Sequence, residues 1–217
     1  MTLLEKTEAD TSIPVGVAET PESLGAIHQP GCSAVIWQRQ PLARFQSWID
    51  TLKPEQLPRA RVILRPEDAR NTASEICEVC GTPNCPERAL LIDDVAALAE
   101  LFAELMSVPY MRLRLDVIST NACRKFHVDA VTARLICTYR GTGTQYGLSI
   151  DAAEPQSVFT VPTGAPILLR GTLWPDRQHE RLLHRSPPIE GTGETRLLLV
   201  LDPVKDPGAF PVRPSMH

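Results

Sequence analysis

The sequence predicts an α+β protein, in which a helical N-terminal part is followed by an antiparallel β part. The longest stretch with helical spacing of apolar residues lies at Glu87–Ser107. From Tyr110 to Glu154 the chain has no proline, and this region contains segments in which polar and apolar residues alternate. The 20 prolines in 217 residues are an unusually high share, which argues against a helical bundle because proline interrupts helices.

We expect one domain behind a short arm. Residues 1–30 are polar and rich in turn-forming residues, which favours a loose arm or lid outside the core. Residues 31–217 then form the domain, with a helical part at 31–108, the β part at 109–205 and a tail at 206–217. The helices are expected to cover the sheet.

Two helices are predicted in the N-terminal part. Apolar residues spaced by three and four span Leu42–Leu52, and Pro54 ends this helix. The longer helix, Glu87–Ser107, has one apolar face, and Pro109 closes it.

The β part divides into short strands separated by prolines and glycines. The alternating segments MRLRLDVIS and ARLICTYR predict two central strands. The segments VFTV, APILLRG, ERLLHRS and TRLLLVLD predict the strands that follow.

Charge and composition exclude several partners. The 22 basic and 26 acidic residues give a net charge of -4 without a dense basic stripe, so nucleic acid is not an expected partner. No apolar stretch is long enough to span a membrane, and the acidic N-terminus does not resemble a secretory signal. We therefore expect a cytoplasmic protein, whose six cysteines are buried thiols or metal ligands rather than disulfides. Composition does not indicate an oligomeric state.

Motifs of three common enzyme classes are absent. The sequence has no Gly-x-Ser-x-Gly nucleophile elbow, no P-loop and no Gly-x-Gly-x-x-Gly between a strand and a helix. Hydrolase, nucleotide-hydrolysing and dinucleotide-dependent functions therefore lack their usual signatures.

A metal site is predicted from two of the five histidines. In a strand, residues two apart face the same way, so His127 and Asp129 in FHVDA project an imidazole and a carboxylate together. His184, in a later strand, adds a second imidazole. Two histidines and one carboxylate are the facial triad of non-haem Fe(II) oxygenases, which leaves the other metal positions open. The alternative is an ordinary hydrogen-bonded histidine at a strand end.

Three features favour the metal site. The chain between His127 and His184 has about the length needed to travel round a double-stranded β-helix and return. Arg196 opens the last strand and is placed to clamp a carboxylate in the same cavity. The Gly-rich loop RGTGTQY turns a strand back across the barrel mouth.

Two alternatives concern individual residues of this site. Arg185 follows His184 directly and is a second candidate for the carboxylate clamp, but alternation points it away from the metal, which favours Arg196. His179 is a lesser candidate for the distal metal ligand.

A weaker second metal site is predicted at Cys77, Cys80 and Cys85 in ICEVCGTPNCPE. Cys-x-x-Cys followed by glycine has the shape of a zinc knuckle, but a fourth ligand is missing. Cys32, His28 or a second subunit would have to supply it. An oxidisable cluster or three unliganded thiols are equally compatible with the spacing.

The segments FHVDAVTARLICTYRGTGTQ and LHRSPPIEGTGETRLLLVLD resemble the bacterial family catalogued as domain of unknown function 1826. At lower resolution they resemble the Fe(II)/2-oxoglutarate dioxygenase superfamily, and the resemblance covers roughly residues 30–205. It implies a jelly-roll, cupin-like double-stranded β-helix in the C-terminal half, with His127, Asp129 and His184 as metal ligands. It also implies that Arg196 anchors 2-oxoglutarate. The first family is associated with bacterial genes for zinc handling.

The expected function is an Fe(II)/2-oxoglutarate-dependent oxygenase with an unknown substrate. Two alternatives remain. One is a metalloenzyme of the same fold that does not use 2-oxoglutarate, with zinc as the alternative metal. The other is a non-catalytic metal-binding protein in zinc or metal homeostasis, in which the cysteine cluster is the functional site.

Overall fold

The structure is a computed structural model that describes residues 15–149, 154–175 and 182–209. Within these residues the strands form two sheets. The larger has the order β1-β2-β8-β5-β10-β4-β3, and the smaller has the order β7-β6-β9. Every neighbouring pair is antiparallel except β1 with β2. The strands are β1 (Val15–Ala18), β2 (Ala34–Trp37), β3 (Ala60–Leu64), β4 (Tyr110–Ile118), β5 (Ala133–Arg140), β6 (Gln145–Leu148), β7 (Phe159–Thr160), β8 (Pro166–Arg170), β9 (Leu182–Arg185) and β10 (Arg196–Val204).

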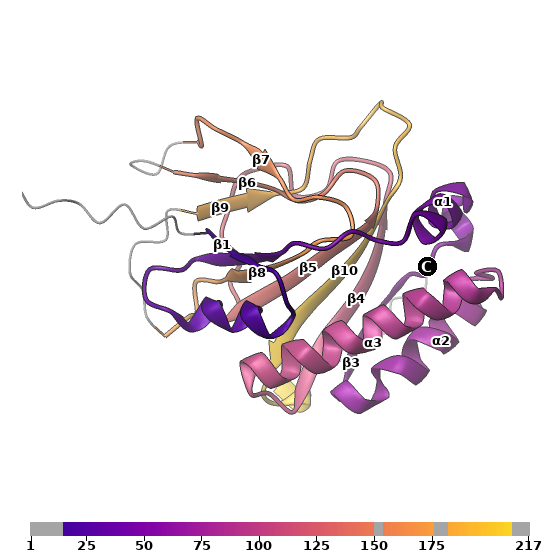
Figure 1. The fold of residues 1–217 in the computed structure, drawn as a ribbon, viewed down its shortest axis with the longest axis horizontal. Coiled ribbons are helices and arrows are strands. Elements are labelled where there is room, and N and C mark those ends of the chain that lie inside the picture. The colour runs from indigo at the N-terminus through magenta and orange to yellow at the C-terminus, as the bar shows by residue number, and fades with distance from the viewer. Residues whose placement is uncertain (1–14, 150–153, 176–181, 210–217) are drawn as a thin grey trace, which may run out of the picture.

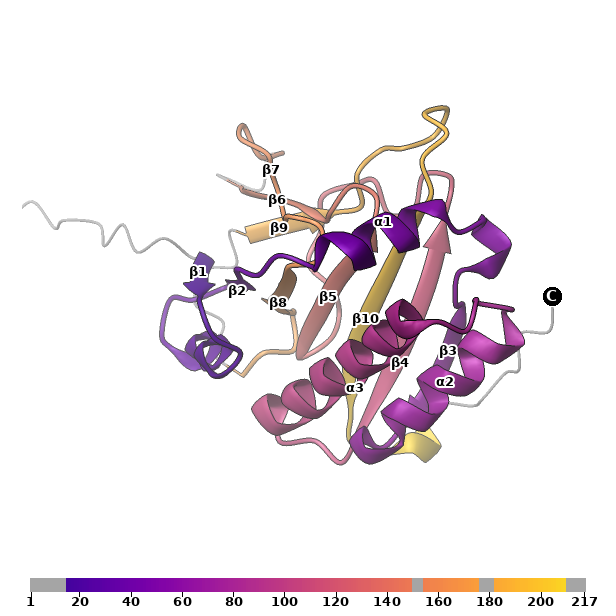
Figure 2. The same cartoon turned by 45° about the vertical axis from the view of Figure 1, so that its right-hand side comes forward.

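Helices cover one face of the larger sheet, and the smaller sheet lies on the opposite face (Figure 1). Figure 2 shows the two longest helices side by side across strands β10, β4 and β3. The α-helices are α1 (Ala43–Thr51), α2 (Ala69–Val79) and α3 (Pro86–Met106), and the 3-10 helices are η1 (Glu22–His28), η2 (Pro54–Gln56), η3 (Pro66–Asp68) and η4 (Pro207–Ala209). None of the helices in the described ranges is both long and apolar enough to cross a membrane.

Strand β10 explains why the fold has two cores. It runs through the middle of the larger sheet, and almost all of its side chains are buried because both faces are covered. Leu197 and Leu199 pack in the cluster beneath the helices, whereas Leu198 and Val200 pack in the cluster between the two sheets. The apolar run of TRLLLVLD therefore serves both cores.

Most of the predicted elements are confirmed. The two predicted helices correspond to α1 and α3, and the six predicted strand segments correspond to β4, β5 and β7–β10. The Gly-rich loop after β5 leads into β6 and so carries the chain from the larger sheet to the smaller one. Gly143 is required in this loop, because a Cβ there would come within 1.8 Å of the Val161 carbonyl oxygen.

The expectation of a loose arm is wrong for the part of it that the structure describes. Strand β1 pairs with β2, and Leu24 and Ile27 of η1 are fully buried. The arm joins the core because η1 packs its apolar residues against the edge of the larger sheet. Residues 1–14 lie outside the described ranges.

The segment 31–108 is also less helical than expected. It contributes β2, which pairs with β8, and β3, which pairs with β4, so both extend the larger sheet. The prediction missed β3 because its five residues stand between two proline-containing segments and show little alternation. It also missed α2, whose apolar positions are mostly small residues.

Candidate metal centre

Two histidines from distant segments stand side by side. The backbone N–H of His127 donates to the carbonyl oxygen of His184, and the reverse bond is also made, both at 3.0 Å. This antiparallel bridge places the two imidazole rings with their centroids 4.6 Å apart. The backbone therefore brings together two side chains that the sequence separates widely.

Asp129 completes the cluster. Its Oδ2 lies 2.9 Å from His184 Nε2, and its Oδ1 lies 3.5 Å from His127 Nε2. One ligand atom from each of the three residues lies within 4.8 Å of the other two. In the part of the chain that the structure describes, this is the only group of three histidine, cysteine or acidic side chains that meets this condition.

The local backbone differs from the predicted strand. Only His127 forms a β-bridge, and the two residues after it are not in a regular strand. Asp129 is held instead by the loop that follows β8, because its carbonyl oxygen accepts from the N–H of Thr172. Gly171 permits this close contact, since a Cβ there would come within 2.0 Å of the Val131 carbonyl oxygen.

The hydrogen bonds around the three residues leave lone pairs available for a metal ion. The Nδ1 of His127 lies 2.9 Å from the Lys125 carbonyl oxygen, which only accepts, so Nδ1 carries the proton and Nε2 keeps its lone pair. The Oδ2 of Asp129 is buried and has no hydrogen bond of acceptable geometry. A buried carboxylate oxygen without a donor is costly unless a cation satisfies it.

Arg134 orients the carboxylate of Asp129. The NH1 of Arg134 lies 2.5 Å from Asp129 Oδ1, while its Nε and NH2 donate to the two oxygens of Asp202 at 2.6 and 2.9 Å. Asp202 is almost fully buried. The sequence analysis did not identify either residue, although each is a charge inside an otherwise apolar strand, which was the available signal.

The Asp129 side chain is acidic enough to be ionised at neutral pH. Burial opposes its ionisation, but contact with His184 and the positive charge of Arg134 outweigh burial and lower its pKa to about 2. The group therefore presents a carboxylate, as metal coordination requires.

Arg196 is a buried cation whose hydrogen bonding is incomplete. Its side chain is 1% exposed. Its Nε donates to the Thr142 carbonyl oxygen at 2.6 Å, its NH1 lies 3.4 Å from Ser186 Oγ, and its NH2 has no partner. Burial lowers the pKa of Arg196 to about 10, so the guanidinium remains charged at neutral pH.

The acids near Arg196 are engaged elsewhere. Glu194 accepts from the N–H and hydroxyl of Thr142, and Asp202 pairs with Arg134. No carboxylate among the described residues lies within ion-pair distance of Arg196. Leu198, two residues along β10, packs between the two sheets together with Leu182, so Arg196 and His184 face the same interior.

The alternative residues lie elsewhere or outside the description. Arg185 donates to Gln145 Oε1 at 2.8 Å and stacks on Phe126, on the face of β9 opposite to His184. His179 falls in the segment 176–181, which is outside the described residues.

Comparison with known families identifies the chain. Residues 18–202 match the family described as "Protein of unknown function (DUF1826)". The chain belongs to this family. A comparison of this DUF1826 protein with curated proteins finds no match.

Solved structures resemble the DUF1826 chain at low sequence identity. Dioxygenase for auxin oxidation 1 from Arabidopsis thaliana, in a binary complex with 2-oxoglutarate, is 10% identical, with a TM-score of 0.51 over 90% of this chain and 93% of that one. The rice dioxygenase for auxin oxidation is 12% identical over 89% and 83%, with a TM-score of 0.49. A 2OG-Fe(II) oxygenase family oxidoreductase from Burkholderia pseudomallei is 12% identical over 86% and 92%, with a TM-score of 0.43. The Arabidopsis likeness shows that the DUF1826 chain shares a mixed α+β fold with large antiparallel sheets.

The three cysteines of the predicted second site have different surroundings in this DUF1826 protein. Cys77 is buried in the core beneath the helices, and burial raises its pKa. The Sγ of Cys80 accepts from the Arg59 N–H. Cys85 is the residue before α3. No ligand cluster of the described residues includes any of the three.

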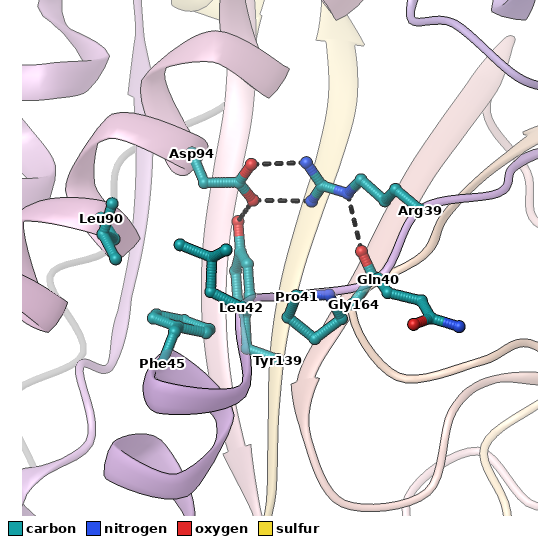
Figure 3. Close-up of a pocket in the computed structure, with 9 residues that line it drawn as sticks. All are labelled: Arg39, Gln40, Pro41, Leu42, Phe45, Leu90, Asp94, Tyr139 and Gly164. Atoms are coloured by element: carbon teal, nitrogen blue, oxygen red, sulfur yellow. Dashed lines mark hydrogen bonds and ion pairs between the residues drawn. The ribbon is translucent and has the colours of Figure 1, made fainter.

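A second polar cluster lies on the helix-covered face of the larger sheet (Figure 3). Arg39 donates to both oxygens of Asp94 at 2.5 and 2.7 Å and to the Gly164 carbonyl oxygen, and Tyr139 donates to Asp94 at 2.7 Å. The charged groups of Arg39 and Asp94 and the hydroxyl of Tyr139 are thus paired with one another. The cluster ties α3 to β5 and to the segment before α1, and we regard it as structural.

Proposed function

We propose that this protein is a non-haem Fe(II)/2-oxoglutarate-dependent oxygenase. The observation that carries the proposal is the buried Arg196, whose guanidinium lacks an acidic partner in the interior that also holds three metal-type ligands. A buried cation of this kind requires an anion. A dicarboxylate that chelates a metal at one end and presents a carboxylate at the other satisfies both features.

The strand order supports the same function. From β4 onward the chain alternates between the sheets: β4 in the larger, His127 bridged to β9 of the smaller, β5 in the larger, and β6 and β7 in the smaller. It continues with β8, β9 and β10 in the same alternation. This alternation is the winding expected of a double-stranded β-helix, and it supports the jelly roll that the sequence resemblance implies.

His127, Asp129 and His184 would hold the metal through two imidazole nitrogens and one carboxylate oxygen. This donor set suits Fe(II) and leaves metal positions open for other ligands. Bound Fe(II) with 2-oxoglutarate supplies the oxidising chemistry: dioxygen oxidises a substrate C–H bond while 2-oxoglutarate loses carbon dioxide to give succinate.

Two arginines of the chain would orient the metal ligand Asp129 and bind the far carboxylate of 2-oxoglutarate. Arg134 occupies Asp129 Oδ1 and so leaves Oδ2 for the metal, which favours coordination through one oxygen. Arg196 would receive the far carboxylate of 2-oxoglutarate, with Thr142 and Ser186 fixing the direction of its guanidinium. Burial excludes water from this contact and strengthens it.

Titration calorimetry under argon, with Fe(II) present, tests the function. The parent is expected to bind 2-oxoglutarate, and Arg196→Met is expected to weaken that binding by about two to three orders of magnitude while metal binding survives. Arg185→Met is the matched control, because Arg185 lies on β9 of the smaller sheet, directly after His184, with its side chain bonded to Gln145 on the other face.

Two results would contradict the proposal: no 2-oxoglutarate binding to the parent, or equal affinities for all three proteins. Metal binding without 2-oxoglutarate binding would instead support a metal-binding protein that does not use 2-oxoglutarate, including one in zinc homeostasis.

A further inference from the structure

A second arginine cluster lies on strands β3 and β4. Arg61 and Arg114 are directly opposite each other in the antiparallel register of the two strands, so their side chains leave the same face of the sheet. Ala60 and Val62 of β3 pack beneath the helices. Because side chains alternate along a strand, Arg61 and Arg114 lie on the opposite face, which is the face of the proposed metal site.

Arg114 has an unsatisfied donor. Its side chain is 17% exposed, and its Nε is buried without a hydrogen-bond partner. Its nearest acid is Asp116 on the same strand, at 3.5 Å from NH1, which is too long for a strong charge-assisted bond. Arg61 makes no ion pair or hydrogen bond with a described residue. Two like charges directly opposite in a ladder repel each other, and among the described residues the ion pair with Asp116 offsets this repulsion for Arg114 only.

The register of β4 with β10 places this arginine cluster close to the proposed metal site. Arg114 pairs with Val200, and Asp202 is two residues further along β10. Diagonal neighbours of this kind are about 7–8 Å apart. Asp202 is linked to Asp129 by Arg134, so Arg114 is one diagonal step from the residues that orient a proposed metal ligand.

The charges of this region favour an anion. Two of its acids, Asp129 and Asp202, are already held by Arg134, and a divalent metal at the site would add further positive charge. Arg61 and Arg114 then stand as two cations beside one acid, Asp116, which lies 3.5 Å from Arg114 NH1.

We propose that Arg114, assisted by Arg61, binds an oxyanion of the primary substrate, so that the substrate class is a small organic acid or phosphate ester. This inference rests on the proposed function, because only an oxygenase makes the bound anion a substrate. Binding of the anion itself requires neither the metal nor 2-oxoglutarate. Guanidinium groups offer paired donors that match carboxylate and phosphate oxygens.

Binding of simple anions to the metal-free, full-length protein tests the inference. The probes are benzoate and phenyl phosphate, with uncharged benzamide as the control ligand, measured by titration calorimetry. The parent should bind at least one of the two anions, and the better-bound one identifies the oxyanion. Arg114→Met and Arg61→Met should each weaken its binding by about tenfold or more. Benzamide should bind neither the parent nor the variants.

Controls separate this site from the 2-oxoglutarate site. Arg65→Met removes an exposed arginine that contacts Tyr110 and should bind the anion like the parent. Arg61 is exposed, so Arg61→Met keeps the test valid if Arg114→Met fails to fold. The affinity for 2-oxoglutarate, measured separately with Fe(II), should be unchanged in Arg61→Met.

Three outcomes would overturn the inference. They are the absence of anion binding to the parent, anion binding by both Arg114→Met and Arg61→Met that is as tight as that of the parent, and loss of anion binding in Arg196→Met alone. The last would show that the probes occupy the site proposed for 2-oxoglutarate. If the parent failed to bind 2-oxoglutarate but still bound the anion through Arg114, the result would count against the oxygenase proposal and not against this inference.

Discussion

Arg134 holds Asp129 by one carboxylate oxygen and leaves the other oxygen to face His184. Its NH1 lies 2.5 Å from Oδ1, whereas Oδ2 is buried without a hydrogen bond and lies 2.9 Å from His184 Nε2. Arg134 is itself fixed by a bidentate pair with Asp202. A chain of two carboxylates and one guanidinium therefore determines which oxygen of Asp129 faces His184.

Removing this guanidinium should weaken metal binding without removing a ligand. For Arg134→Met we expect metal affinity to fall by about 10- to 100-fold, the usual effect of losing a group that orients a ligand. Because Asp202 would be left buried and unpaired, the double variant Arg134→Met/Asp202→Asn is the control for lost stability. Competition with a coloured chelator measures affinity. Parent-like affinity in the double variant would contradict the orienting role.

The three proposed ligands should each be necessary for the site. His127→Ala, Asp129→Ala and His184→Ala should each abolish stoichiometric metal binding, since two remaining donors hold a divalent ion weakly. Atomic emission on folded protein gives the metal content, and circular dichroism checks the fold. Full metal content in all three variants would rule out this ligand set.

The cysteines should be independent of that site. Replacing Cys77, Cys80 and Cys85 by serine should leave the stoichiometric metal in place, because none of the three thiols belongs to the cluster. Thermal stability should fall because Cys77 is 1% exposed in the core, where serine would bury a more polar hydroxyl group. Loss of the metal with unchanged thermal stability would show that the thiols contribute ligands.

The metal-free protein should lose stability in acid partly through Asp129. Its pKa is lowered from 3.8 to about 2 in the folded state, so the ionised group stabilises the fold above pH 4 and this contribution is lost as the pH falls through 2. The advantage of the parent over Asp129→Asn in free energy of unfolding, roughly 2 kcal/mol at pH 5, should therefore vanish near pH 2. Urea denaturation across this range measures it; a difference independent of pH would exclude the linkage.

The cluster in Figure 3 should stabilise the fold and leave the metal site unaffected. Arg39→Met removes a bidentate ion pair and a bond to the Gly164 carbonyl oxygen, for an expected loss of about 1–3 kcal/mol. Arg70→Met is the matched control. Its ion pair with Asp93 is more than half exposed on both sides, so its loss should cost less than about 1 kcal/mol. Thermal unfolding compares the two, and equal effects would contradict the structural role.

Local patterns in the sequence were enough to predict the helix at α3 and the central strands. Helical spacing and alternation depend on neighbouring residues, and prolines mark the ends of these elements. The same local reasoning paired His127 with Asp129 and selected Arg196 over Arg185 by alternation. The structure brings His127 and Asp129 together through an irregular segment instead of a strand. Local patterns failed at η1 and β3, where tertiary packing against the large sheet decides burial and pairing.

Tertiary structure alone decided the surroundings of each charged group. The distances from Arg134 to Asp129 and to Asp202 arise from the antiparallel register of β5 with β10 and from the loop that holds Asp129. The opposition of Arg61 and Arg114 likewise depends on the register of β3 with β4. Strand register is a long-range property, because it is selected by the packing of both faces of the sheet together, and a one-residue shift would turn every one of these side chains to the other face.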